Sequence, residues 1–171
     1  MKDALLLVDV INDFRHEEGD KLLESFRERH VALLRALEDA RRRDIPVIYA
    51  NDNFGVWDGD SKRLVAEAQE GEAGELVERI APRAHDRFVV KPRYSAFDHT
   101  PLVLILRELD VERILLAGSA TEMCVLQTAI DAKEEGLKVS ILADACATTD
   151  PEIERLALRY AAEIVGARVD R

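Results

Sequence analysis

The sequence has few cysteines, no excess of positive charge and no long apolar run. Two cysteines, Cys124 and Cys146, among 171 residues cannot build a disulfide framework. The formal net charge of −10 argues against nucleic-acid and anionic-membrane partners, because both demand a basic patch. No apolar run approaches the roughly 20 residues of a membrane span, and no basic flank or cleavage site precedes the first apolar run. We therefore expect a cytoplasmic protein with small-molecule or protein partners.

Several common catalytic motifs are also missing. The chain contains no glycine-rich phosphate loop, no G-x-S-x-G elbow, no C-x-x-C pair and no H-E-x-x-H helix. A phosphate-accepting receiver domain is disfavoured as well, because Lys91-Pro92 follows the third of six expected strands rather than the last. Because these motifs are absent, the reaction has to be inferred from individual reactive residues.

What the chain does contain is an alternation of short apolar runs with helical patterns. The apolar runs predict strands near 4–8, 46–50, 87–91, 114–118, 137–142 and 167–169. Helical spacing predicts helices near 20–43, around 64, around 76–80, and near 100–109, 121–135 and 151–164. We therefore predict a single domain over 1–171 of the α/β class, a three-layer α/β/α fold with a six-stranded, mostly parallel sheet and helices on both faces.

One strand turns almost directly into a helix that carries a thiol. Gly118 is expected to permit the turn, and Thr121 is expected to cap the helix that holds Cys124. The positive end of a helix dipole favours a thiolate, so the pKa of Cys124 is expected to lie below the roughly 8.5 of a free cysteine. The alternative is a small apolar residue that packs in the turn, since free cysteines are often buried.

Three strand ends carry complementary reactive groups. Asp9 follows the first strand, Lys91 ends the third, and Cys124 follows the fourth. Ligands of open α/β sheets bind at the carboxyl ends of the strands, so these groups are expected to meet there. A base, a cation and a nucleophile are the parts of a nucleophilic acyl-transfer site. Taken singly, Asp9 is better explained as a loop cap and Lys91 as a solvated strand end.

Three segments resemble the isochorismatase-like cysteine hydrolase superfamily, which includes nicotinamidases and N-carbamoylsarcosine amidohydrolase. The first is LLVDVINDF at 6–14, with Ile11 where the family usually has glutamine. The second is KPRYSAF at 91–97, and the third is GSATEMCV at 118–125 followed by Thr128, Asp131 and Ala132. The resemblance extends over essentially the whole chain.

The resemblance implies a catalytic triad of Asp9, Lys91 and Cys124. It also implies a cis peptide bond between Ser119 and Ala120, and an oxyanion hole formed by the backbone N–H groups of Ala120 and Cys124. The expected reaction is hydrolysis of a small amide or related C–N bond through a thioester on Cys124. Two alternatives remain: an isochorismatase-type vinyl-ether hydrolase, which needs no thiol, and a non-catalytic binding or scaffold protein on the same fold.

The sequence defines the substrate pocket and the oligomeric state less closely than it defines the triad. We expect aromatic and polar side chains in the site loops to line the pocket: Phe14, Asn51, Phe54, Trp57, Tyr94 and Phe97. Trp57 alternatively covers a subunit contact. By resemblance, the chain is expected to form a homodimer or homotetramer.

No metal or cofactor is expected. Nicotinamidases of the superfamily carry a metal site just after the second strand, built from an aspartate and histidines. The corresponding segment, 51–58, contains no histidine, and Asp52 and Asp58 offer only hard oxygen ligands. His30 lies on an apolar helical stripe, which favours a hydrogen-bonded packing histidine over a ligand. We therefore predict a metal-free hydrolase for which nicotinamide is a poor substrate.

Overall fold

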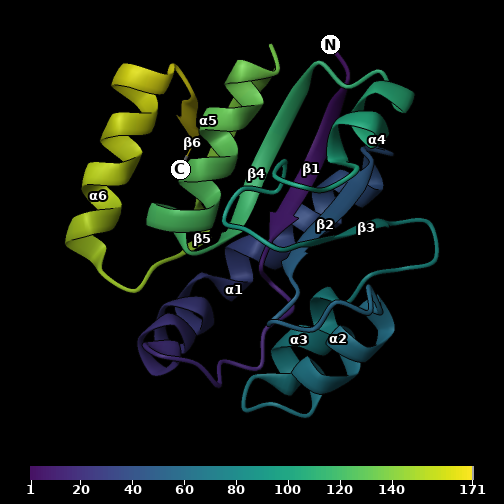
Figure 1. The fold of residues 1–171 in the computed structure, drawn as a ribbon. Helices are drawn as coiled ribbons and strands as arrows, with labels where there is room; N and C mark the ends of the chain where they lie inside the picture. Colours follow the sequence, from purple (N-terminus) through teal and green to yellow (C-terminus); the bar gives the residue numbers. More distant parts are fainter. Residues whose placement is uncertain (171) are drawn as a thin grey trace.

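The protein is built around one parallel sheet of six strands (Figure 1). The computed structural model describes residues 1–170. The strands are β1 (Asp3–Val8), β2 (Val47–Asp52), β3 (Arg87–Lys91), β4 (Arg113–Ser119), β5 (Lys138–Ala147) and β6 (Arg168–Asp170). Their order is β3-β2-β1-β4-β5-β6, and every neighbouring pair is parallel.

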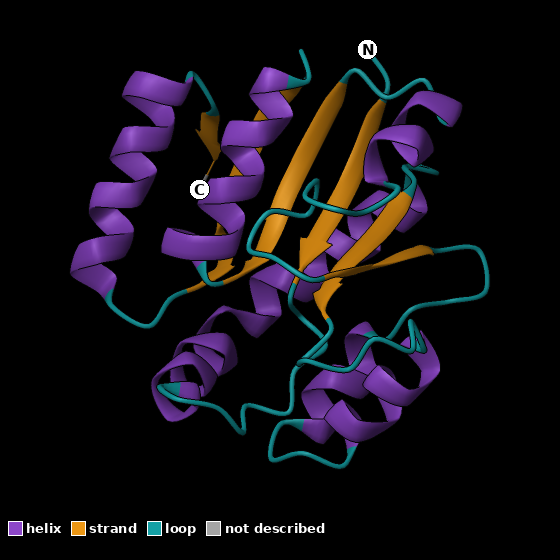
Figure 2. Cartoon of the chain, in the orientation of Figure 1, coloured by secondary structure: helices purple, strands orange, loops and turns teal. Residues whose placement is uncertain are grey.

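Helices cover both faces of this sheet (Figure 2). One face packs against α1 (Gly19–Arg42), α2 (Ser61–Gln69) and α3 (Gly74–Ile80). The other packs against α4 (Leu102–Glu108), α5 (Leu126–Glu134) and α6 (Pro151–Tyr160). Single π-helical turns, η1 (Thr121–Val125) and η2 (Ala161–Val165), precede α5 and follow α6. The predicted three-layer α/β/α fold is confirmed, and no helix among residues 1–170 is long and apolar enough to cross a membrane.

Burial on both faces of the sheet explains why β1 is apolar throughout. Leu5 and Leu7 pack on the face of α1, whereas Leu6 and Val8 pack on the opposite face, and all four are fully buried. A strand covered on both faces has no solvent side on which to place polar residues. The continuous apolar run is therefore explained by burial in two separate cores.

The order of the strands reverses between β1 and β4. From β1 the chain moves outward to β2 and β3, and from β4 it moves outward on the other side to β5 and β6. Crossovers that leave a parallel sheet in opposite directions open a crevice at the carboxyl ends of the two central strands. Asp9 follows β1 at this crevice, and η1 follows β4.

Two strands run further than their apolar residues predict. The strand β2 continues to Asp52 because Asn51 and Asp52 pair with Val90 and Lys91. The strand β5 continues to Ala147 after a register shift opposite β4, which lets its last residues pair with Gly118 and Ser119. In both cases backbone pairing continues through polar residues, so hydrophobicity alone places the strand end too early.

The apolar stripe of α6 and η2 faces solvent. Helical spacing correctly predicts the helix, yet the stripe residues are about half exposed or more: Ile153, Leu156, Tyr160 and Ile164. The buried side instead carries Glu154, Ala157 and Leu158. The sequence pattern thus identifies the element but not the face that meets the core.

His30 is a packing residue without the expected hydrogen bond. Its side chain is 2% exposed and its ring lies 5.6 Å from that of Phe26, between centroids. Neither ring nitrogen has a hydrogen-bond partner among residues 1–170, so the prediction of a hydrogen-bonded histidine is wrong. Burial, assisted by the charge of Arg79, lowers the pKa of His30.

Candidate active site

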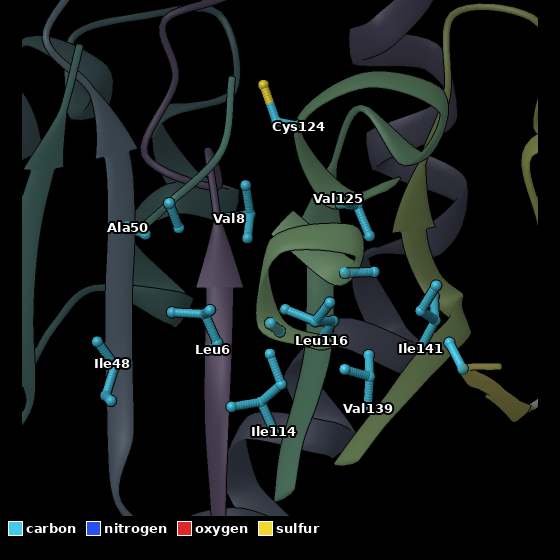
Figure 3. Close-up of a cluster of buried hydrophobic side chains, with 14 of the residues drawn as sticks. Leu6, Val8, Ile48, Ala50, Ile114, Leu116, Cys124, Val125, Val139 and Ile141 are labelled. Carbon is cyan, nitrogen blue, oxygen red and sulfur yellow. The ribbon is translucent and has the colours of Figure 1, made fainter. Parts of the chain in front are cut away.

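The three predicted reactive side chains meet at the carboxyl end of the sheet. The Nζ atom of Lys91 lies 2.8 Å from Oδ2 of Asp9 and 3.4 Å from Sγ of Cys124. Figure 3 shows Cys124 beyond the end of β1, with its sulfur directed away from the aliphatic cluster below. One ammonium group therefore contacts both a carboxylate and a thiol at the point where the strand order reverses.

Lys91 is fully buried, and its ammonium group has three close partners. Besides Asp9 and Cys124 it donates a hydrogen bond to the carbonyl of Arg93, at 2.9 Å. Burial alone would lower the pKa of Lys91, but the nearby Asp9 carboxylate and the Cys124 sulfur raise it above its usual value. A solvated strand end would show neither the burial nor these contacts, so that interpretation of Lys91 is wrong.

Asp9 is held in place by its neighbours on both sides. Its Oδ1 accepts a hydrogen bond from the backbone N–H of Asp52 at 2.7 Å, and its carbonyl accepts one from the Ser119 hydroxyl at 3.0 Å. Burial raises the pKa of the Asp9 carboxyl, against the opposing effect of the Lys91 ammonium. Asp9 therefore caps a backbone group with one carboxylate oxygen and pairs with the Lys91 ammonium through the other.

The thiol of Cys124 is more difficult to ionise than expected. Its side chain is buried. Burial and the negative charge of Asp9 both raise the pKa of Cys124, and together they outweigh the lowering effect of the Lys91 ammonium. The predicted lowering of this pKa by a helix terminus is therefore wrong. The raised pKa favours the protonated form of the thiol.

The turn that carries Cys124 begins at Ala120 rather than at Thr121. The carbonyl of Ala120 accepts hydrogen bonds from the N–H groups of Met123 and Val125, at 3.1 and 3.2 Å. The preceding Ser119–Ala120 peptide bond is cis, the geometry that the resemblance implies. The N–H of Ala120 has no hydrogen-bond partner within residues 1–170. It is thus free to bind an oxygen atom.

Gly118 lies inside β4 and serves close strand packing rather than the expected turn. Its φ is +130°, and a Cβ atom there would lie 2.0 Å from the carbonyl oxygen of Val8. Only glycine allows β1 and β4 to approach this closely at their carboxyl ends. The glycine thereby holds the two strands that deliver Asp9 and Cys124 side by side.

Comparison with known proteins identifies the family. The family model of the isochorismatase domain matches residues 3–170. The chain belongs to the isochorismatase family. It is 34% identical over 166 residues to the uncharacterised isochorismatase family protein YaaI of Bacillus subtilis. The aligned region covers 97% of this chain and 92% of YaaI.

Solved structures agree with this assignment. The nicotinamidase PncA from Bacillus subtilis has 31% identity and a TM-score of 0.81 over 100% of both chains. The N-carbamoylsarcosine amidase from Thermoplasma acidophilum has 29% identity and a TM-score of 0.76, over 100% of this chain and 96% of that one. The protein is a hydrolase of the isochorismatase family.

The residues expected to line a pocket lie in different surroundings. Phe14 packs on Phe26 in the core, with ring centroids 5.2 Å apart. The amide of Asn51 bonds the backbone of Ile11 in both directions, at 3.0 and 2.9 Å. Phe97 packs against the core beside α4. The other three, Phe54, Trp57 and Tyr94, are exposed.

A cavity of about 480 Å³ next to the triad includes only one of these six side chains. It is lined by Asp52, Pro92, Arg93, Tyr94, Ser95, Asp98, Gln127 and Asp131. Gln127 comes three residues after Cys124 and so lies on the same side of the helical turn. That spacing would have identified Gln127 from the sequence. The position of Pro92 to Ser95 directly after Lys91 would have identified four more of the lining residues.

Residues 51–58, where the family resemblance implies a metal site in nicotinamidases, do not fit a metal in this chain. The Asp52 carboxylate accepts a hydrogen bond from the N–H of Phe54, and Asn53 bonds the N–H of Gly55 in the same way. Asp58 pairs with Arg63 at 2.8 Å. Within residues 1–170, no three or more His, Cys, Asp or Glu side chains gather as a set of metal ligands.

Proposed function

We propose that this hydrolase cleaves a small amide or related C–N bond through a thioester on Cys124. The observation that supports the proposal most directly is the Lys91 ammonium group, which contacts both the Asp9 carboxylate and the Cys124 sulfur. A thiol beside a buried carboxylate forms a nucleophile and base pair, and the cation favours the ionised carboxylate against the effect of burial.

In the first half of the reaction Asp9 takes the proton of the Cys124 thiol as the sulfur attacks the substrate carbonyl. The carbonyl oxygen becomes negative, and the N–H groups of Ala120 and Cys124 stabilise it. Asp9 then passes its proton to the leaving nitrogen, the C–N bond breaks, and ammonia or an amine departs. The acyl group is left on sulfur as a thioester.

In the second half water replaces the leaving group. Asp9 accepts a proton from water, which attacks the thioester carbon, and the same N–H groups stabilise the second oxyanion. The C–S bond breaks, the carboxylic acid leaves, and the proton on Asp9 returns to the sulfur. Lys91 stays protonated throughout and stabilises the negative charge that alternates between Asp9 and the sulfur.

A panel of small amides, with ammonia release as the readout, tests this proposal. Cys124→Ala and Asp9→Asn are each expected to abolish release while circular dichroism shows an intact fold. A vinyl-ether hydrolase would release no ammonia from the panel, but it would cleave a vinyl ether and would keep that activity in Cys124→Ala. A scaffold protein would show neither activity. Substantial amide hydrolysis by either variant would disprove the mechanism.

A further inference from the structure

The turn η1 is anchored by a buried carboxylate from another helix. Thr121, the first residue of η1, is 1% exposed, and its hydroxyl donates to Oε1 of Glu154 at 2.8 Å. Glu154 lies on α6 and is itself only 6% exposed. The proposed nucleophile Cys124 lies in the same turn, three residues after Thr121, so this contact anchors the element that carries the thiol.

The other oxygen of Glu154 is held from the opposite face of the sheet. Arg29 of α1 donates to Oε2 of Glu154 at 3.1 Å and to the carbonyl of Ala143 in β5 at 2.8 Å. Arg29, Glu154 and Thr121 thus form a continuous polar chain from α1 to η1. Since α1 and α6 cover different faces, this chain joins elements from both faces of the sheet.

Stability alone is a poor reason for this arrangement. The Glu154 carboxylate loses its hydration on burial, whereas the paired Arg29 side chain is still 29% exposed. Well-packed apolar residues in place of a buried charged pair are often neutral or stabilising. The surrounding side of α6 is apolar, with Ala157 and Leu158 buried next to Glu154. An apolar residue at 154 would suit that side, but it would leave the Thr121 hydroxyl with only the Ala147 carbonyl, at 3.1 Å, and would release η1 from α6.

We propose that Glu154 is a positioning residue, which holds Thr121 and thereby sets the position of the Cys124 sulfur relative to Asp9 and Lys91. The proposal rests on the thiol chemistry proposed above. A displacement of η1 by a fraction of an ångström would move the sulfur and the N–H groups of Ala120 and Cys124 together. Misplacement of about 1 Å costs on the order of 100-fold in rate.

Enzyme kinetics on matched variants test this inference. Glu154→Leu is expected to lower kcat by about 10- to 100-fold with little change in KM, and Glu154→Gln, which still accepts from Thr121, is expected to recover most of kcat. Glu152→Leu and Glu152→Gln are the controls, because Glu152 lies on the same helical turn but is exposed. Both controls are expected to retain wild-type kcat.

A double-mutant cycle shows whether Glu154 acts through Thr121. Thr121→Val is expected to lower kcat as much as Glu154→Leu, and the double variant to be no worse than either, since both remove the same Thr121–Glu154 contact. Thr121→Val also serves if Glu154→Leu does not fold. Additive losses, or a lower melting temperature with unchanged kcat, would overturn the proposal.

A measurement without substrate separates this inference from the proposed function. The rate of Cys124 alkylation by iodoacetamide, followed by mass spectrometry of the Cys124 peptide, is expected to fall in Glu154→Leu but not in Glu152→Leu. If the wild type cleaved no amide while this difference held, amide hydrolysis would be refuted and positioning supported. Equal alkylation rates in both variants would refute positioning.

Discussion

The buried Asp9 carboxylate determines the pH at which the thiol can be activated. It must be ionised to accept the Cys124 proton, and burial raises the pKa of Asp9 above its usual value. We therefore predict that kcat/KM falls with decreasing pH through an ionisation above about 4, the ordinary value for aspartate. A pH–rate profile measures this directly, and a profile that stays flat from pH 7 down to pH 4 would contradict it.

His30 makes the stability of the fold depend on pH in a predictable direction. Burial lowers the pKa of His30 in the folded state, so on acidification the unfolded chain binds this proton first. The stability present above the unfolded pKa of about 6.5 is therefore lost as the pH falls from that value towards the folded pKa.

Substitution of this residue tests that assignment. His30→Leu is expected to reduce the loss of unfolding free energy between pH 7 and pH 5, because it removes the titrating group. His85→Leu, at an exposed position, is the control and is expected to keep the wild-type slope. Urea unfolding at several pH values gives the comparison, and equal slopes for wild type and His30→Leu would be the contrary result.

Among the structural elements, β1 and β4 make a contact that is sensitive to substitution at Gly118. Gly118→Ala would place a Cβ atom against the carbonyl of Val8 at a positive φ, and should destabilise the fold by roughly 2 to 4 kcal/mol. Gly55→Ala is the matched control, because Gly55 also has a positive φ but open space around its Cβ position.

Gly55→Ala should cost about 1 kcal/mol, the backbone strain alone. Chemical denaturation of both variants therefore separates steric overlap from strain. If Gly118→Ala were no more destabilising than Gly55→Ala, the close approach of β1 and β4 would not be the reason for glycine at this position.

The sequence predicts the elements better than it predicts their faces and ends. Parallel strands share one carboxyl edge, so Asp9, Lys91 and Cys124 could be brought together from strand order alone. Glu154 could not, because the apolar stripe of α6 suggests that the charged side faces solvent, whereas the structure buries it. Its partners Thr121 and Arg29 come from distant parts of the chain, and only tertiary contacts bring them to it.

For the whole molecule, the fold is shared with nicotinamidases while the metal-binding segment differs. Since residues 51–58 contain no histidine and their carboxylates are engaged, we predict well below one zinc or iron per chain in protein purified without chelators. Elemental analysis measures this content. A near-stoichiometric metal content would show that other residues supply the ligands.

Nicotinamide should accordingly be hydrolysed poorly. Without a metal ion to bind the ring nitrogen, the site lacks the contact that orients a pyridine amide. Ammonia release from nicotinamide should be much slower than from the best amide of the panel. Nicotinamide as the preferred substrate would contradict this prediction.

The thioester on Cys124 is the central claim, and a mass measurement during turnover tests it most directly. Wild-type protein mixed with its best amide and quenched in acid should gain the mass of the acyl group on the peptide that contains Cys124. Protein in which Cys124 is already carbamidomethylated should gain no acyl group and release no ammonia. Continued ammonia release from that blocked protein, or an acyl group on another residue, would contradict the account.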